Sequence, residues 1–192
     1  GKTTLQRGIA EALRARGRTV VETKEPTDGP LGRRIREIAA TGRTGVTPQE
    51  ELRLFHEDRT EHVALVVRPA LERGEVVVQD RSFFSTVAYQ GERGLDRAKL
   101  LEQSRRVAPD PDVLLVVDIP AETALHRIRS GRGVPTDDFE TLESLSRVRN
   151  VFLGFADAIV IDGMQSPEQV LAASLRAIDD AEGSCEERRS PG

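Results

Sequence analysis

The first residues of the chain are of types that bind phosphate groups. Gly1, Lys2, Thr3 and Thr4 lead directly into an amphipathic segment, and they match the second half of the phosphate-binding loop G-x-x-x-x-G-K-[ST]. In that loop, backbone N–H groups and a helix N-terminus hold phosphates, the lysine reaches the terminal phosphates, and the next hydroxyl binds Mg²⁺. We therefore expect these residues to bind ATP, with Thr3 as a metal ligand. The first half of the motif is absent, and we expect it to precede Gly1, together with a first strand, in the intact protein.

Two further residues that could bind a metal ion or a phosphate follow a run of valines. Asp80 and Arg81 come directly after Val76, Val77 and Val78, so both side chains should emerge at the carboxyl end of a central strand, where open α/β sheets place their ligands. An aspartate there can hold Mg²⁺ through water, and an arginine can fork onto a phosphate. A strand-ending aspartate beside a surface arginine is the alternative interpretation.

Four short, mostly apolar runs alternate with longer amphipathic segments, the pattern of parallel strands joined by helices. We expect an α/β fold of the P-loop NTPase type, with helices on both faces of a parallel sheet. The expected strands span residues 18–23, 75–79, 112–119 and 158–161.

The helices that should position the candidate residues begin at recognisable caps. A helical pattern covers residues 3–16, and Thr47 with a proline and an acidic residue after it starts a long helix that Pro69 should kink or end. The last helix should run from Ser166 to about Ala181. We expect one domain over residues 1–181 and a flexible tail over 182–192, with a loop at 130–138.

Composition narrows the class of protein. The 192 residues carry a net charge of −4, which argues against a nucleic-acid polymer as partner, because such proteins need excess basic surface. No apolar run approaches the roughly 20 residues that span a bilayer. The only cysteine, Cys185, gives neither a disulfide framework nor a metal-ligand set. We expect a cytoplasmic protein that binds small nucleotides and has no membrane partner.

Several stretches resemble the bacterial thymidylate kinases. The run from Asp80 to Gly91, DRSFFSTVAYQG, is similar to the DR-x-x-x-S-x-x-AYQG segment of that family. Further matches, in the same order as in the family, lie at residues 23–26, 54–59, 147–149 and 161–162. The similarity extends from Gly1 to about Ala181. It implies transfer of a phosphate from ATP to thymidylate (dTMP) with Mg²⁺, giving dTDP for dTTP biosynthesis, by a homodimer.

The resemblance also implies a pocket for the base of the acceptor nucleotide. Phe55 would stack on thymine, a contact worth roughly 1–3 kcal/mol in single-strand binders, and Arg59 would donate to the base. Thr86 and Gln90 would line the same pocket, and Tyr89 would pack beside it. A core phenylalanine is the alternative interpretation of Phe55.

By the same resemblance, a second group of residues would act on the phosphates. Arg81 would bind the acceptor phosphate, while Glu25 and Asp80 would arrange water, metal and phosphates around the transferring group. The loop after Arg127 corresponds to the lid that closes over ATP in this family. Arg127 and Arg132 are the expected catalytic arginines of that lid, with a solvated basic turn as the alternative.

The sequence departs from the family pattern at several positions. Lys24 replaces the usual arginine, Ser82 stands where many members have Tyr or His, and Asp138 replaces a lid arginine. A kinase for another nucleoside monophosphate, a nucleotide-binding module without catalysis and a generic P-loop ATPase therefore remain as rivals.

Two remaining sets of polar residues should lie at the surface. We expect the three histidines there, and we expect a solvated helix face for the basic cluster at residues 33–36, with an anion-binding patch near the acceptor phosphate as the alternative. The histidines are His56, His62 and His126.

Overall fold

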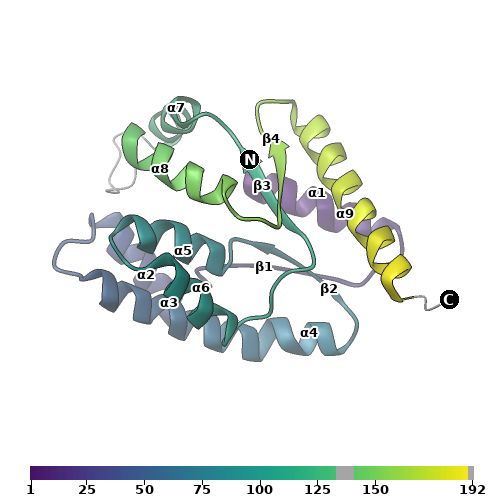
Figure 1. Ribbon diagram of the computed structural model, residues 1–192, viewed down its shortest axis with the longest axis horizontal. Coiled ribbons are helices and arrows are strands. Elements are labelled where there is room, and N and C mark those ends of the chain that lie inside the picture. Colours follow the sequence, from purple (N-terminus) through teal and green to yellow (C-terminus); the bar gives the residue numbers. More distant parts are fainter. Residues whose placement is uncertain (133–140, 190–192) are drawn as a thin grey trace.

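The computed structural model of the protein describes residues 1–132 and 141–189, in which short parallel strands alternate with helices (Figure 1). The predicted strands are confirmed, with slightly different ends. They are β1 (Val20–Lys24), β2 (Val76–Asp80), β3 (Leu114–Asp118) and β4 (Ala158–Asp162).

The strands form two hydrogen-bonded parallel pairs. In one pair Val20 of β1 lies opposite Val76 of β2, and in the other Leu114 of β3 lies opposite Ala158 of β4. Within the described part of the chain, no ladder joins β2 to β3. Leu115 of β3 nevertheless packs in the same apolar cluster as the β2 side chains, so both pairs lie under one layer of helices.

Helices cover both faces of the strands, as expected. Helices α1 (Lys2–Ala15) and α9 (Pro167–Arg189) pack together on one face. Helices α4 (Arg68–Glu72), α5 (Phe83–Glu92) and α8 (Leu142–Leu153) cover the other face (Figure 1). The remaining helices are α2 (Pro30–Ala40), α3 (Pro48–His62), the π-helical turn η1 (Val63–Val67), α6 (Arg97–Arg105) and α7 (Ala121–Arg132).

Successive side chains of β2 point to opposite faces of the sheet and so join two different hydrophobic clusters. Val76 and Val78 join the cluster around Ile9 and Leu13 of α1, whereas Val77 joins the cluster that includes Phe83 of α5. This follows from the strand period of two, which points successive side chains to opposite faces. The helix α5, which carries several candidate residues, is thereby anchored by its own first turn.

The long helix begins and breaks where the sequence predicted. Thr47 Oγ1 accepts a hydrogen bond from the backbone N–H of Glu50 at 3.2 Å, and Glu50 accepts one from the backbone N–H of Thr47 at 2.8 Å. The helix turns π-helical at Val63–Val67, directly before the Arg68–Pro69 start of α4, because proline cannot donate the regular backbone bond. The capping box and the interruption at Pro69 are both confirmed.

Two predicted helix ends were wrong. Helix α9 continues past Ala181 to Arg189, since Glu and Arg favour helix and outweigh the single Gly183. Helix α7 extends to Arg132, so residues 130–132 are helical and not part of a loop. The rest of that predicted loop lies outside the described residues. None of the described helices is long and apolar enough to cross a bilayer.

Candidate active site

The N-terminus of α1 is a site where an anion can bind. Gly1 is the N-cap, no side chain caps the helix, and its first turn contains no acidic residue. Lys2, Thr3 and Thr4 are all exposed. No acidic side chain of this first turn offsets the partial positive charge of the helix end, which suits a phosphate group.

The ends of β1 and β2 bring two acidic residues together. The backbone N–H of Glu25 donates to the carbonyl oxygen of Asp80 at 3.1 Å, although the two are far apart in the sequence. Asp80 is half-buried at the carboxyl end of β2, as predicted. This edge of the sheet thus places the half-buried Asp80 directly before Arg81 and beside the turn that carries Glu25.

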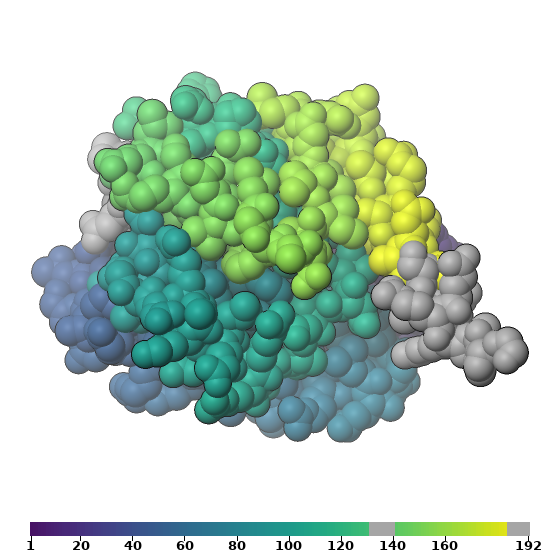
Figure 2. All heavy atoms as spheres, in the orientation of Figure 1, coloured from purple at the N-terminus to yellow at the C-terminus, as the bar shows by residue number. Residues whose placement is uncertain are grey.

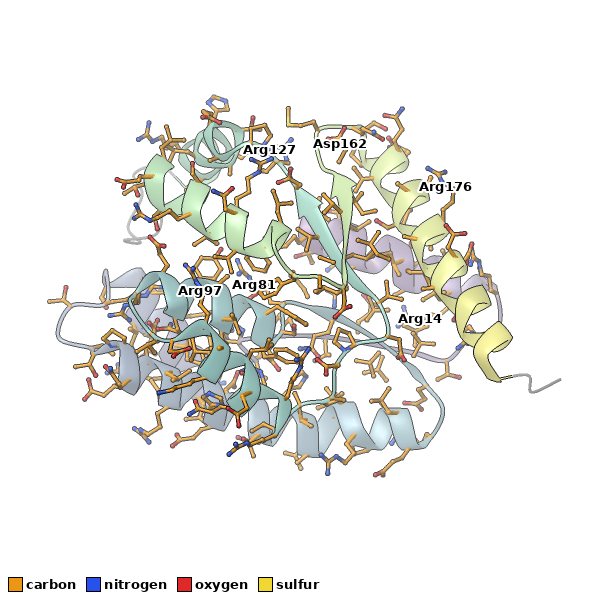
Figure 3. All side chains as sticks on the ribbon, viewed as in Figure 1. Arg14, Arg81, Arg97, Arg127, Asp162 and Arg176 are labelled. Atoms are coloured by element: carbon orange, nitrogen blue, oxygen red, sulfur yellow. The ribbon has the colours of Figure 1, made fainter. Side chains whose placement is uncertain are left out.

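Arg81 adopts an unusual backbone conformation. Its φ is 67°, in the left-handed region that costs a non-glycine residue on the order of 1 kcal/mol or more. Gln79 donates from Nε2 to the carbonyl oxygen of Arg81 at 2.8 Å, and the guanidinium lies 5.4 Å from the centroid of the Tyr89 ring. Figure 3 shows Arg81 in the middle of the molecule, between α8 and α5.

A buried ion pair joins the β1 end to α3. Arg59 donates from Nε and Nη2 to Oε2 of Glu25, at 2.9 and 2.7 Å, and Nη2 also donates to Thr86 Oγ1 of α5 at 2.9 Å. All three residues are buried. Arg59 and Thr86 are thus side by side, as expected, but they are joined by Glu25, which was expected with Asp80 among the phosphates.

His62 completes this network, so its predicted surface position was wrong. Its ring is buried, with Nδ1 3.1 Å from Glu25 Oε1 and Nε2 2.6 Å from Thr23 Oγ1. Because a carboxylate can only accept, Nδ1 carries the proton and Nε2 accepts from the Thr23 hydroxyl. The spacing of His62 from Arg59, one turn along the helix, was the signal that placed it on this face.

The two basic neighbours of Glu25 decide its charge. Burial by itself would raise the pKa of the Glu25 carboxyl, but the hydrogen bond from His62 and the charge of Arg59 outweigh burial and lower the pKa below 4.5. Glu25 is thus an anion at neutral pH. Both of its oxygens are engaged by side chains of α3.

A second buried carboxylate, Glu51, was missed by sequence reasoning. Its Oε2 accepts from Gln90 Nε2 at 2.9 Å and from Arg93 Nη1, and its Oε1 accepts from Arg43 Nε at 3.0 Å. The available signal was its position four residues before Phe55, on the face of α3 that also carries Arg59.

Hydrogen bonds join the facing sides of α3 and α5 at two levels. Glu51 of α3 accepts from Gln90 of α5, and two helical turns further along α3 Arg59 donates to Thr86. By helix period the half-buried Phe55 lies on the same face of α3, between these two contacts.

Within residues 1–132 and 141–189, two of the buried polar atoms without a hydrogen-bond partner lie on the facing sides of α3 and α5. They are Nη1 of Arg59, a donor, and Oε1 of Gln90, an acceptor. Buried groups of this kind cost free energy unless something pairs with them. A ligand that offers one acceptor and one donor on the same edge would satisfy both.

Other side chains hold the turn after β1. Asp58 accepts from the N–H and the hydroxyl of Thr27 at 2.9 and 2.6 Å, and Arg36 donates to the carbonyl oxygen of Pro26 at 2.9 Å. Arg33, Arg34 and Arg36 are all exposed, as expected for a solvated face, and Arg36 in addition reaches the Glu25–Pro26 turn. Local sequence carries no signal for this long-range contact.

Of the two arginines expected in the lid, the structure describes the side chain of one, Arg127. Arg127 on α7 is exposed (Figure 3), while the Arg132 side chain and Asp138 lie outside the described residues.

Helix α8 is anchored to the end of β3, because Arg149 donates to both Asp118 oxygens at 2.6 and 2.7 Å. These bonds lower the pKa of Asp118. Figure 2 shows the surface of α8 meeting that of α5.

A cavity of about 420 Å³ lies beside β1 and is lined by Thr3, Thr23, Lys24 and His62, among others. Thr23 and His62, which belong to the hydrogen-bond network of Glu25, line this cavity, but none of the expected base-binding residues does. The buried atoms of Arg59 and Gln90 without a partner lie outside this cavity.

The oxygen atoms near α1 suit Mg²⁺ better than a softer metal. The described residues contain no cluster of three His, Cys, Asp or Glu side chains. Mg²⁺ is usually held by one or two carboxylates, waters and substrate phosphates, so the Thr3 hydroxyl and the Asp80 carboxylate fit such an ion.

This arrangement defines the class of protein. Parallel strands between helical layers, a Gly-Lys-Thr-Thr helix start and acidic and basic residues at the strand ends are the features of a P-loop nucleotide-binding protein. A sequence model of the family described as thymidylate kinase matches residues 1–173. The chain belongs to the thymidylate kinase family.

Individual relatives agree with this family. A thymidylate kinase of Xanthomonas euvesicatoria pv. vesicatoria is 47% identical over 173 residues, covering 89% of this chain and 75% of the relative. A thymidylate kinase of Xylella fastidiosa is 46% identical over 180 residues, covering 93% and 85% respectively.

Proposed function

We propose that this protein transfers the γ-phosphate of ATP to dTMP and forms dTDP. The observation that carries the choice of acceptor is the membership of the thymidylate kinase family. It is supported by two buried atoms without a partner among the described residues, Arg59 Nη1 and Gln90 Oε1, which suit the edge that thymine shares with uracil. Thymine carries an acceptor, O4, next to a donor, N3–H. A thymine edge can therefore pair with both atoms.

The neighbouring side chains support a planar base in this position. Phe55 offers an aromatic face between the two polar pairs, and Thr86 and Gln90 line the opposite helix. Tyr89 would close the pocket beside the base, where Arg81 already lies over its ring. Each buried hydrogen bond to the base should add to selectivity, because a mismatched base leaves a buried group unpaired.

The acceptor phosphate would lie near Arg81. Its side chain starts at the carboxyl end of β2, where ligands of open α/β sheets bind, and a guanidinium matches phosphate oxygens in a two-point contact. The left-handed φ of Arg81 fits a residue held in a strained conformation for function. Arg36, which reaches the turn at Pro26, would add charge to the same region.

ATP would bind at the start of α1. Gly1, Lys2, Thr3 and Thr4 would receive its phosphates, with Lys2 stabilising charge on the transferring group. When bound, Mg²⁺ neutralises phosphate charge, and Thr3 and Asp80 are the residues that would hold it. Arg127 and Arg132 would approach the phosphates from the lid side, where arginines can contribute roughly 10³ to 10⁵ in rate.

Glu25 would act mainly through Arg59. Both of its oxygens already accept hydrogen bonds from Arg59 and His62, so we assign it the positioning of Arg59 and not direct contact with the metal. Phosphoryl transfer relies on alignment and charge stabilisation more than on covalent chemistry, so such positioning is expected to influence the rate.

A homodimer and a cytoplasmic location complete the proposal. The dimer follows from the family resemblance, and the cytoplasm is where ATP and nucleoside monophosphates are available. Sedimentation analysis would test the dimer, with a monomer at micromolar concentration as the contrary result.

Turnover with a panel of acceptors tests the proposed function. The intact polypeptide that contains this sequence would be given ATP, Mg²⁺ and dTMP, dUMP, dCMP or dGMP, with ADP release measured by a coupled assay. We expect dTMP to give the highest kcat/KM. A clear preference for another monophosphate, or no dependence on any of them, would refute the choice of acceptor.

A further inference from the structure

The buried carboxylate of Glu51 accepts a hydrogen bond from Gln90, one of the residues that would line the proposed base pocket. We propose that Glu51 fixes the orientation of the Gln90 amide and thereby determines which base edge the site accepts. This inference rests on the proposed function and makes Glu51 a positioning residue that acts through Gln90.

The contacts of Glu51 leave its carboxylate no freedom to turn. The residue is completely buried, and Arg43 Nε donates to Oε1 at 3.0 Å while Arg93 and Gln90 donate to Oε2. Arg93 also donates from Nη2 to the carbonyl oxygen of Val46 at 3.0 Å. The carboxylate is therefore held by residues from both sides of the pocket.

The chemistry of a carboxylate then fixes the amide. Glu51 offers only acceptors, so Gln90 must present its Nε2 donor to it, as the 2.9 Å distance shows. Oε1 of Gln90 is left buried without a protein partner. A rotation of the amide by half a turn would set two acceptors against each other and is therefore unfavourable.

A fixed acceptor at Gln90 selects among bases. Thymine and uracil carry a donor, N3–H, and can pair with Oε1. Cytosine carries an acceptor at N3 and would be left facing a second acceptor in a buried site. Glu51 should thus favour thymine and uracil over cytosine, and it should have no influence on the thymine methyl group.

The variant Glu51→Gln tests this proposal. With two arginines competing for its oxygen, the new amide directs Nε2 at Gln90, whose own oxygen then turns toward residue 51. The ratio of kcat/KM for dTMP over dCMP should fall by about tenfold or more, as for a mismatched buried hydrogen bond. The ratio for dTMP over dUMP should stay the same. An unchanged dTMP/dCMP ratio in an active variant would overturn the proposal.

Two further variants separate positioning from general damage. Glu51→Asp keeps an acceptor-only side chain, so it should retain the dTMP/dCMP ratio even if its overall activity is lower. Glu102→Gln, an exposed change on α6 at a residue paired with Arg106, should leave both ratios unchanged. A fall in the ratio in Glu51→Asp as large as in Glu51→Gln would contradict the orientation argument.

Binding measurements keep the test independent of turnover. Calorimetric titration of dTMP and dCMP gives the same ratio as dissociation constants, so absence of dTMP turnover in the wild type would refute the proposed function alone. If Glu51→Gln does not fold, the side-chain amide protons of Gln90 in the wild type decide the matter by NMR. They should stay protected from exchange with and without dTMP, and loss of protection on binding would overturn the inference.

Discussion

His62 donates a hydrogen bond from Nδ1 to Oε1 of Glu25 across 3.1 Å, and the two side chains are only 2% and 5% exposed. Through Glu25 the imidazole is linked to Arg59 and so to the proposed base pocket. Substitutions at His62 should therefore affect substrate binding although the residue lies behind the pocket.

Two substitutions of His62 by amide residues test its link to Glu25 separately from its link to Thr23. In His62→Asn the amide nitrogen takes the place of Nδ1 and can still donate to Glu25, whereas in His62→Gln it takes the place of Nε2 and reaches Thr23 instead. We expect KM for dTMP to rise about tenfold in His62→Gln, the size of one lost hydrogen bond to a charged group, and to change less in His62→Asn. Steady-state kinetics check this, and equal KM values in the two variants would show that the link to Glu25 has no such role.

The lowered pKa of Glu25 predicts a stability change in acid. Its folded pKa lies below the unfolded value of 4.5, so ionised Glu25 stabilises the fold fully above pH 4.5. That contribution is lost as the pH falls through the folded pKa. The difference in unfolding free energy between wild type and Glu25→Gln should thus be constant near pH 7 and shrink below pH 4.5. Urea unfolding across this range measures it, and a difference that grows in acid would be the contrary result.

Gly32 should not tolerate a side chain. A Cβ at this position would lie 1.9 Å from the carbonyl oxygen of Thr27, which is backbone and cannot rotate away. We expect Gly32→Ala to destabilise the protein by about 1–3 kcal/mol and to raise KM for dTMP, because Thr27 is held by Asp58 beside Arg59. Thermal unfolding measures the first effect and kinetics the second.

Gly183 gives the matched control. It lies in α9 with no atom near its would-be Cβ, so Gly183→Ala should be neutral or stabilise by up to about 1 kcal/mol. Equal destabilisation by the two substitutions would mean that close packing at Gly32 is not the cause.

Arg81 should matter for catalysis and little for folding. Arg81→Ala keeps the Cβ, so the left-handed backbone conformation costs the same in both proteins and the melting temperature should hardly change. We expect kcat/KM for dTMP to fall by about 10² to 10³, as when one donor to developing charge is lost. Arg105→Ala, which removes an exposed ion pair with Asp110, should keep full activity. Retained activity in Arg81→Ala would remove Arg81 from the site.

Much of the fold could be predicted because its signals are local. Apolar β-branched runs such as Val76–Val78 predict the strands, and the capping box at Thr47 predicts the start of α3. The extent of α7 and α9 could not be read in this way, since glycine near a helix end weakens the pattern without ending the hydrogen-bonded helix.

The site was predictable where a residue belongs to a motif and not where its role depends on a distant partner. Arg59 and Gln90 were found through their motifs, but Glu51 and His62 gain their roles from contacts with Gln90 and Glu25, which are distant along the chain. The spacing of His62 from Arg59 put both on one face of the helix, but nothing in the neighbouring sequence indicates that Glu25 after β1 will bury that face.

Transfer of labelled phosphate tests the central claim most directly. The intact protein would be given dTMP, Mg²⁺ and ATP labelled in its γ-phosphate, and the products would be separated. We predict that the label appears in dTDP in an amount equal to the ADP formed. Release of the label as inorganic phosphate, with no labelled dTDP, would contradict the account and indicate an ATPase, and no release of label at all would indicate a nucleotide-binding protein without catalysis.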